Sequence, residues 1–227
     1  MKLSLKKYHK IIKLADQYKF DKFDLVTNYG LFSGERNLYK TLKVFEFLKS
    51  TFLIRGDIIE FGIFRGNNSL LIKKILEIYK VKKKLFLLDH FKGLENFDKS
   101  DGKGSKRYAG SYKGSKKEIN SFIKFFKLKN IKIIDQDATK LKKGFFGKTR
   151  FSFAYFDLDL FQPTIKSLEI LDASMNKGGL ILFDEGNWKT WGVRNAISKF
   201  LKANKKYKKI ILKKYYQPDI VLKKIKE

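Results

Sequence analysis

Short apolar runs typical of strands alternate with longer helical patterns along most of this chain, and this alternation constrains its fold more than any other feature. The strand-like runs are residues 57–61, 85–89, 131–134, 151–157 and 179–184. The helical patterns cover residues 5–20, 35–52, 67–79, 115–126, 163–173 and 191–203. Strands that alternate with helices predict βαβ units, and therefore an α/β fold built on a parallel sheet. The 227 residues suffice for one such domain.

Two local signals refine this prediction. Pro163 near the start of a helical pattern and Gly178-Gly179 beyond its end match the usual placement of proline and glycine at helix ends. The C-terminal run KKIILKKYYQPDIVLKK holds two strand-like stretches around a short turn at Gln217-Pro218, which predicts an antiparallel hairpin. A mostly parallel sheet of seven strands that closes with such a hairpin resembles the Rossmann-like class I methyltransferase fold.

This fold divides the chain into an N-terminal part and a main domain. We expect residues 1–55 to form helices that pack on the core, and residues 56–227 to form the methyltransferase-like domain. Residues 96–114 are rich in glycine, lysine and serine and lie between a strand and a helix. Long loops of this kind in compact domains are often lids, so we expect a lid there.

A strand-end acid followed by glycines opens the first helix of the main domain, in the pattern ExGxxxG formed by Glu60, Gly62 and Gly66. Glycines at the carboxyl end of a strand let the backbone approach a ligand. A nicotinamide dinucleotide fingerprint would need glycine where this chain has Phe64 and Asn67. The loop therefore favours S-adenosylmethionine (SAM) as the cofactor, and a tight turn without a ligand is the alternative.

The next two strands also end in groups that suit a nucleoside. Asp89 ends the second strand, where a carboxylate can accept hydrogen bonds from both ribose hydroxyls, although a turn or capping aspartate is the alternative. Asp137 and Ala138 follow the third strand, and a polar group beside a small residue there could face an adenine edge. Suitable groups at three successive strand ends support one cofactor site.

Four acids follow the last two parallel strands: Asp157, Asp159, Asp184 and Glu185. Residues 151–191 hold six acids and three lysines, although the chain as a whole carries a net charge of +28. Carboxylates that crowd into one crevice are costly unless they are protonated or neutralised by a cation. Oxygen ligands suit Mg²⁺, Mn²⁺ or Ca²⁺, so the cluster predicts a divalent metal site. The alternative is that some of these acids cap helices.

The runs GDIIEFGIFRGNNS, LLDHFKGL, FAYFDLDLFQPTIKSLEIL and GGLILFDEGNW resemble the macrocin O-methyltransferase family, the TylF-type enzymes of sugar tailoring. The resemblance covers roughly residues 28–200. It implies a SAM-dependent and Mg²⁺-dependent enzyme that methylates a sugar hydroxyl on a small glycoside, a nucleotide sugar or a surface glycan. It also implies self-association, for which the aromatic helix at residues 35–52 is a candidate contact.

The resemblance also assigns roles to residues. It implies Asp157, Asp184 and Glu185 as metal ligands and Asp159 as the general base, and we keep His90 as a second base candidate. For the cofactor it implies Glu60 and Gly62 at the methionine part, Asp89 at the ribose and Asp137 at the adenine side, and Gly66 and Ala138 belong to the same loops. Trp188 and Trp191 could stack on a sugar, although packing is the alternative.

Composition keeps two other functions open. The charge of +28 would suit a nucleic-acid-binding or RNA-modifying protein, but only six of the 51 basic residues are arginine, the side chain that phosphate and base recognition favours. The DxD pattern of Asp157 and Asp159 would suit a metal-dependent glycosyltransferase. The absence of cysteine excludes disulfides and thiolate metal sites. No apolar run is long enough for a membrane span and no apolar leader is present, so we expect a cytoplasmic protein.

Overall fold

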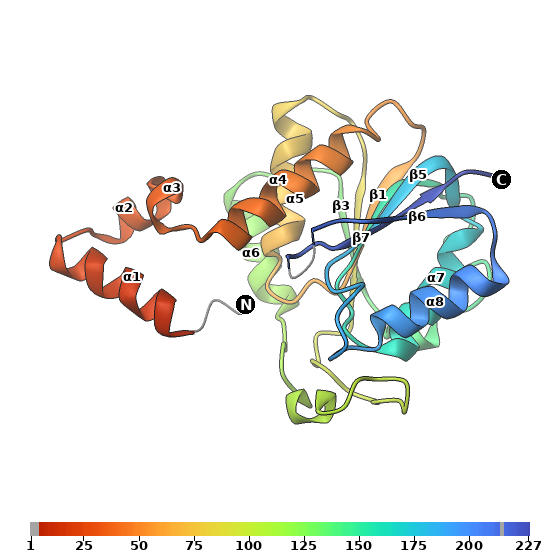
Figure 1. Cartoon of the computed structure of the whole chain (residues 1–227). Helices are drawn as coiled ribbons and strands as arrows, with labels where there is room; N and C mark the ends of the chain where they lie inside the picture. Colours follow the sequence, from red (N-terminus) through yellow and green to blue (C-terminus); the bar gives the residue numbers. More distant parts are fainter. Residues whose placement is uncertain (1–4, 214–215) are drawn as a thin grey trace.

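The computed structural model describes residues 5–213 and 216–227 (Figure 1). Within these residues, seven strands form one sheet in the order β3-β2-β1-β4-β5-β7-β6. The strands are β1 (Asp57–Phe61), β2 (Leu85–Asp89), β3 (Ile131–Asp135), β4 (Phe151–Phe156), β5 (Met175–Phe183), β6 (Tyr207–Ile211) and β7 (Ile220–Lys224). Strands β1 to β5 pair in parallel, whereas β7 runs antiparallel to both β5 and β6. This topology confirms the predicted class I methyltransferase fold.

Helices cover both faces of the sheet (Figure 1). On one face lie α4 (Glu35–Lys49), α5 (Asn67–Ile78) and α6 (Lys116–Phe125), and on the other lie α7 (Phe161–Asp172) and α8 (Val193–Ala203). Each layer has its own apolar core. Val44, Ile72 and Ile119 belong to the first core, and Leu168 and Ile197 belong to the second. Both faces of the parallel strands are therefore buried, as is usual for such sheets.

The alternation of side chains along each strand decides which core a residue joins. In β4, Ala154 and Phe156 belong to the core under α7 and α8, whereas Phe153 and Tyr155 belong to the core under α4 and α5. The same period of two turns Glu60 of β1 toward α5. Polar side chains on this face of β1 and β4 are therefore within reach of residues on α4 and α5.

The N-terminal part has two regions. Helix α4 packs against α5 and β5, whereas α1 (Leu5–Gln17), α2 (Lys22–Thr27) and α3 (Tyr29–Phe32) stand away from the sheet in Figure 1. Residues 1–4 of the segment that we predicted to pack on the core lie outside the described residues. In the part of the chain that the structure describes, no helix is long and apolar enough to cross a membrane.

Of the two helix-end predictions, one is confirmed and one was wrong. Helix α7 begins at Phe161, so Pro163 lies in its first turn as expected, where backbone N–H groups have no partner in the helix. Gly178 and Gly179 do not end this helix but lie inside β5, next to a shift in the β4–β5 register. Gly178 has a φ of 84°, and glycine inside a strand often marks such an irregularity.

The closing hairpin is antiparallel as predicted, but its connection is longer than the short turn that we expected. Strand β6 ends at Ile211 and β7 begins at Ile220. The connection reaches α4: the backbone N–H of Lys213 donates to the hydroxyl of Tyr39 (3.2 Å), and the Tyr39 and Tyr216 rings lie 4.9 Å apart. These contacts hold the connection between β6 and β7 against α4.

Candidate active site

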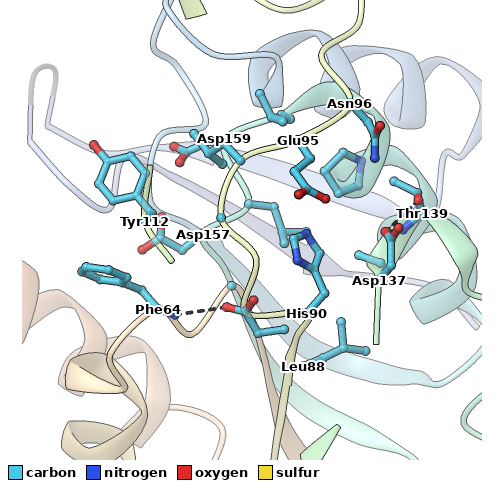
Figure 2. Close-up of a pocket in the computed structure, with 18 of the residues that line it drawn as sticks. Phe64, Leu88, His90, Glu95, Asn96, Tyr112, Asp137, Thr139, Asp157 and Asp159 are labelled. Atoms are coloured by element: carbon cyan, nitrogen blue, oxygen red, sulfur yellow. Dashed lines mark hydrogen bonds between the residues drawn. The ribbon is translucent and has the colours of Figure 1, made fainter. Parts of the chain in front are cut away.

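A cavity of about 310 Å³ lies at the carboxyl ends of the parallel strands (Figure 2). This is at the lower end of the range for small-molecule sites, about 300 to 1,000 Å³. Nine of the predicted site residues line it: Gly62, Asp89, His90, Asp137, Ala138, Asp157, Asp159, Asp184 and Glu185. The structure thus brings the predicted cofactor groups and the four acids into one space.

The glycine loop passes directly beside the end of β4. Gly62 has a φ of 80°, and a Cβ atom added to it would overlap the carbonyl oxygen of Asp157. The backbone N–H of Asp157 donates to the carbonyl oxygen of Phe61 (2.9 Å). Glycine is therefore required at position 62 for conformation as well as for space.

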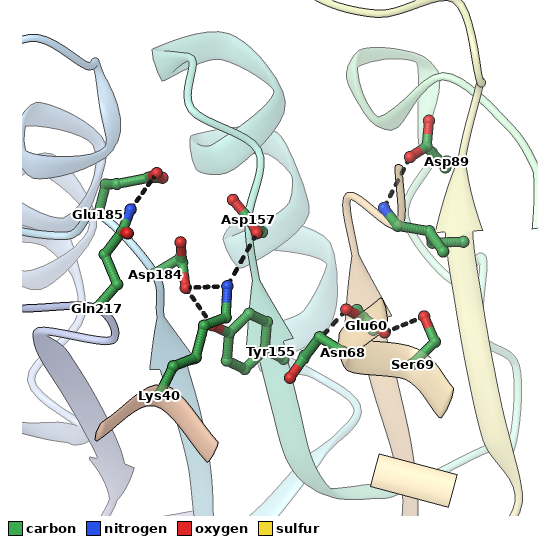
Figure 3. Close-up of polar contacts among 11 residues, drawn as sticks. Lys40, Glu60, Asn68, Ser69, Asp89, Tyr155, Asp157, Asp184, Glu185 and Gln217 are labelled. Atoms are coloured by element: carbon green, nitrogen blue, oxygen red, sulfur yellow. Dashed lines mark hydrogen bonds and ion pairs between the residues drawn. The ribbon is translucent and has the colours of Figure 1, made fainter. Parts of the chain in front are cut away.

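Glu60 and Gly66 are not among the described residues that line the cavity. The Glu60 carboxylate is 2% exposed and accepts hydrogen bonds from Asn68 (3.0 Å) and Ser69 in the first turn of α5 (Figure 3). Burial raises the pKa of Glu60 to about 7, against the lowering effect of these two bonds. The alternation along β1 points the Glu60 side chain toward α5. Gly66 is the N-cap of that helix.

Asp89 holds the glycine loop in shape. Its Oδ2 accepts the backbone N–H groups of Ile63 (2.7 Å) and Phe64 (3.1 Å), and its Oδ1 accepts that of Phe91 (2.7 Å). Figure 2 shows the bond from Phe64. The turn contact that we gave as the alternative for Asp89 is therefore present, and the same carboxylate lines the cavity.

Asp137 caps a short helix beside the cavity, η2 (Ala138–Lys140). Its Oδ1 accepts bonds from the backbone N–H (2.8 Å) and the hydroxyl (2.7 Å) of Thr139. Burial raises the pKa of Asp137, but the two Thr139 bonds are the main effect against it, and the pKa is lowered. His90 accepts the backbone N–H of Lys92 at its Nδ1 (3.0 Å).

The acids form one cluster at the ends of β4 and β5. Asp157, Asp184 and Glu185 each offer a carboxylate oxygen, and these three oxygens lie within 4.8 Å of one another. Burial and the neighbouring carboxylates raise the pKa values of Asp157 and Glu185 well above their usual range. Asp159 is 8% exposed, and burial together with the charge of Asp184 raises its pKa to about 6.

A lysine that sequence reasoning missed reaches into this cluster from α4. The ammonium of Lys40 lies 2.7 Å from Oδ1 of Asp184 and 3.7 Å from Oδ2 of Asp157 (Figure 3). Burial lowers the pKa of Lys40, but the two carboxylates outweigh it and raise the pKa. Lys40, Val44 and Leu48 follow one another at intervals of four, which places Lys40 on the buried face of α4 and is the signal that could have found it.

Two further side chains hold the acids from either side. The hydroxyl of Tyr155 donates to the same Oδ1 of Asp184, and Gln217 donates to Oε1 of Glu185 (2.6 Å). In the described parts of the chain, Oε2 of Glu185 is buried without a hydrogen-bond partner. Buried carboxylate oxygens normally have partners, so an unpaired one beside two further carboxylates fits a hard divalent cation.

Asn96 and Tyr112 of the segment that we predicted as a lid line the cavity. Tyr112 of this segment packs edge-on against Phe64 of the glycine loop (5.8 Å between ring centres), and both residues line the cavity. Asp101 accepts the backbone N–H of Phe161 at the start of α7 (2.7 Å).

Trp191 is 7% exposed and packs against the Tyr108 ring, as the packing alternative for this tryptophan requires.

Solved structures with a similar fold include sugar-tailoring enzymes. CalS11, described as a calicheamicin methyltransferase, has a TM-score of 0.81 at 20% identity, covering 100% of this chain and 94% of that chain. Its apo form, described as a TDP-rhamnose 3'-O-methyltransferase of calicheamicin biosynthesis, has a TM-score of 0.72 at 19% identity, covering 100% and 96%. The O-methyltransferase NovP has a TM-score of 0.67 at 16% identity, covering 82% and 79%. At these identities the similarity shows a shared fold.

A comparison of the sequence with curated proteins found no match. The model of the macrocin O-methyltransferase (TylF) family, in contrast, matches residues 33–213. This match includes α4 with Lys40, the glycine loop and all four acids of the cluster. The chain therefore belongs to the macrocin O-methyltransferase (TylF) family and is a SAM-dependent O-methyltransferase.

Proposed function

We propose that this protein transfers the methyl group of SAM to a sugar hydroxyl, with a divalent cation, Mg²⁺ in the first place, held by Asp157, Asp184 and Glu185. The observation that carries the proposal is that one cavity is lined both by the cofactor-type loops and by the acid cluster. A methyl donor and a metal-held acceptor could therefore meet in one space, as an in-line transfer requires.

The cofactor part of the cavity offers groups for each portion of SAM. Gly62 lines the cavity and would offer its backbone to the methionine part. The Asp89 carboxylate lines the cavity, and its Oδ1, which accepts one backbone N–H, keeps a lone pair for a ribose hydroxyl. Asp137 and Ala138 lie where a polar and a small group would border adenine. In this proposal Glu60 contributes indirectly, because its hydrogen bonds with Asn68 and Ser69 hold the first turn of α5 in place.

The acid cluster supplies the acceptor chemistry. A bound divalent cation lowers the pKa of an oxygen that it coordinates, from 15.7 to about 7 for water. Asp159 then accepts the proton of the sugar hydroxyl, since a carboxylate with a pKa of about 6 is ionised at neutral pH and still basic enough to act.

His90 is the weaker base candidate. Its Nδ1 accepts the backbone N–H of Lys92, so the ring proton of the neutral imidazole is on Nε2. Neither nitrogen then has a free lone pair for the proton of an incoming hydroxyl. This hydrogen bond favours Asp159 as the base.

The acceptor is proposed to be a nucleotide sugar, with a small glycoside or a surface glycan as further members of the same class. CalS11, described as a TDP-rhamnose methyltransferase, supports this choice because it matches over the whole of this chain. The test is methyl transfer from labelled SAM, in the presence of Mg²⁺, to TDP-sugars and, separately, to ribosomal RNA. Transfer to TDP-sugars is expected. Transfer to RNA alone would overturn the sugar acceptor while leaving the methyltransferase in place.

A further inference from the structure

The proposed methyl transfer does not require a lysine at the position of Lys40. It belongs to α4, which precedes the sheet in the chain, yet its ammonium lies against two carboxylates at the ends of β4 and β5 (Figure 3). Val44 and Leu48 on the same face of α4 are fully buried, so the helix itself is anchored and directs Lys40 toward the cluster.

Lys40 and Tyr155 together use the Asp184 oxygen that faces them. Both side chains donate to Oδ1 of Asp184. A carboxylate oxygen accepts about two hydrogen bonds, one for each lone pair. Oδ1 therefore has no lone pair left for a metal ion while Lys40 remains in place.

Charge leads to the same conclusion. Lys40 is a positive group 3.7 Å from Asp157, and a divalent cation bound by Asp157 and Asp184 would lie at similar short range from the ammonium. Two positive charges this close repel strongly in a partly buried site. The ammonium and the cation thus exclude one another from the carboxylate pair.

We propose that Lys40 is an internal cation that competes with the divalent metal ion for Asp157 and Asp184. In the metal-free protein Lys40 offsets part of the negative charge of this pair, and it withdraws when the metal ion binds. Lys40 therefore sets the metal affinity of the site. This inference rests on the metal site of the proposed function and concerns how that site is controlled.

The test is a titration with Mn²⁺ at pH 8, in the absence of SAM, with free Mn²⁺ measured by electron paramagnetic resonance. It compares wild type with K40M, K40Q, K40R and K43M. Lys43 is the matched control, because it lies on the same helix, has a side chain 28% exposed against 26% for Lys40, and pairs with Glu46 instead. K40M is expected to bind Mn²⁺ at least about tenfold more tightly than wild type, since both the competing ion pair and the repulsion are gone. K40R and K43M are expected to stay within about twofold.

The outcomes separate the inference from the proposed function. Mn²⁺ binding by K40M and K40Q that equals or falls below that of K43M would overturn the competition and leave the metal site in place. A lack of binding in every variant would overturn the metal site and the competition with it. Binding by K40M where wild type shows none would support it. Circular dichroism on the same samples checks that each variant is folded, and calorimetric titration of SAM tests the cofactor site separately. A failure of SAM binding in all of them would count against the cofactor site alone.

Discussion

The carbonyl oxygen of Asp157 lies where a side chain on Gly62 would have to begin. The first strand's loop and the fourth strand's end are therefore in backbone contact, and neither can shift without the other. This contact connects the proposed cofactor loop with the first residue of the acid cluster.

Gly62→Ala is expected to destabilise the protein by at least about 2 kcal/mol and to abolish SAM binding, because it adds both a backbone overlap and a strained φ. The control is Gly144→Ala, since Gly144 also has a φ of 80° but has no atom within 4 Å of an added Cβ. Urea unfolding measures both free energies. An equal loss of unfolding free energy in the two variants would show that the contact with Asp157 is unimportant.

Asp159→Asn is expected to keep SAM and metal binding but to lose about 10²-fold to 10⁴-fold in turnover, as for loss of a general base. In the wild type, kcat/KM for methyl transfer should fall as the pH is lowered through about 6, because protonated Asp159 cannot accept a proton. The measurement is a pH profile of methyl transfer from labelled SAM. A flat profile between pH 5 and 7 would contradict the assignment.

Asp157→Ala is expected to weaken Mn²⁺ binding by more than about 100-fold and to leave SAM binding within about threefold, since one of three metal ligands is lost. EDTA should likewise stop methyl transfer by the wild type, and added Mg²⁺ should restore it. Asp135→Ala is the control, because Asp135 is a half-exposed strand-end acid outside the cluster. Full activity of the wild type in EDTA would remove the metal ion from the proposal.

Glu60→Gln is expected to stabilise the protein at pH 8 and to change its pH dependence. The buried Glu60 has a pKa of about 7 in the folded protein, above its ordinary value of 4.5, so the folded state binds the proton more tightly. Its contribution to stability is present below pH 4.5 and is lost as the pH rises through 7, by about 3 kcal/mol. Urea unfolding from pH 4 to 8 should show this loss in wild type and in Glu169→Gln, and not in Glu60→Gln. If the free energy of unfolding of Glu60→Gln depended on pH as it does in wild type, Glu60 would have to be ionised over the whole range.

The mostly parallel sheet and the place of the site could be predicted because both follow from patterns along the chain. Apolar runs alternate with helical patterns, and parallel strands bring their carboxyl ends to one edge, so acids such as Asp89, Asp157 and Asp184 had to lie near one another. Most strand and helix bounds agree to within a few residues for the same reason.

The features that we did not predict depend on which helix and strand faces pack together. Patterns along the sequence do not show this packing. Glu60 follows the cofactor motif, but only the packing of α5 on β1 shows that its carboxylate bonds to Asn68 and Ser69. Lys40 is one lysine among many in a basic chain and lies more than 100 residues before its partners. Gly178 and Gly179 read as a helix stop because an irregular strand and a turn use glycine for the same conformational freedom.

The three backbone N–H groups that Asp89 accepts have a consequence for how a cofactor would enter. The chain's own carboxylate already fixes the conformation of residues 63 and 64, so little chain entropy remains to be lost on binding. Association should then resemble the docking of two preorganised surfaces. The heat-capacity change of SAM binding should match the apolar area that SAM covers. It should be smaller than the change expected if a loop folded on binding.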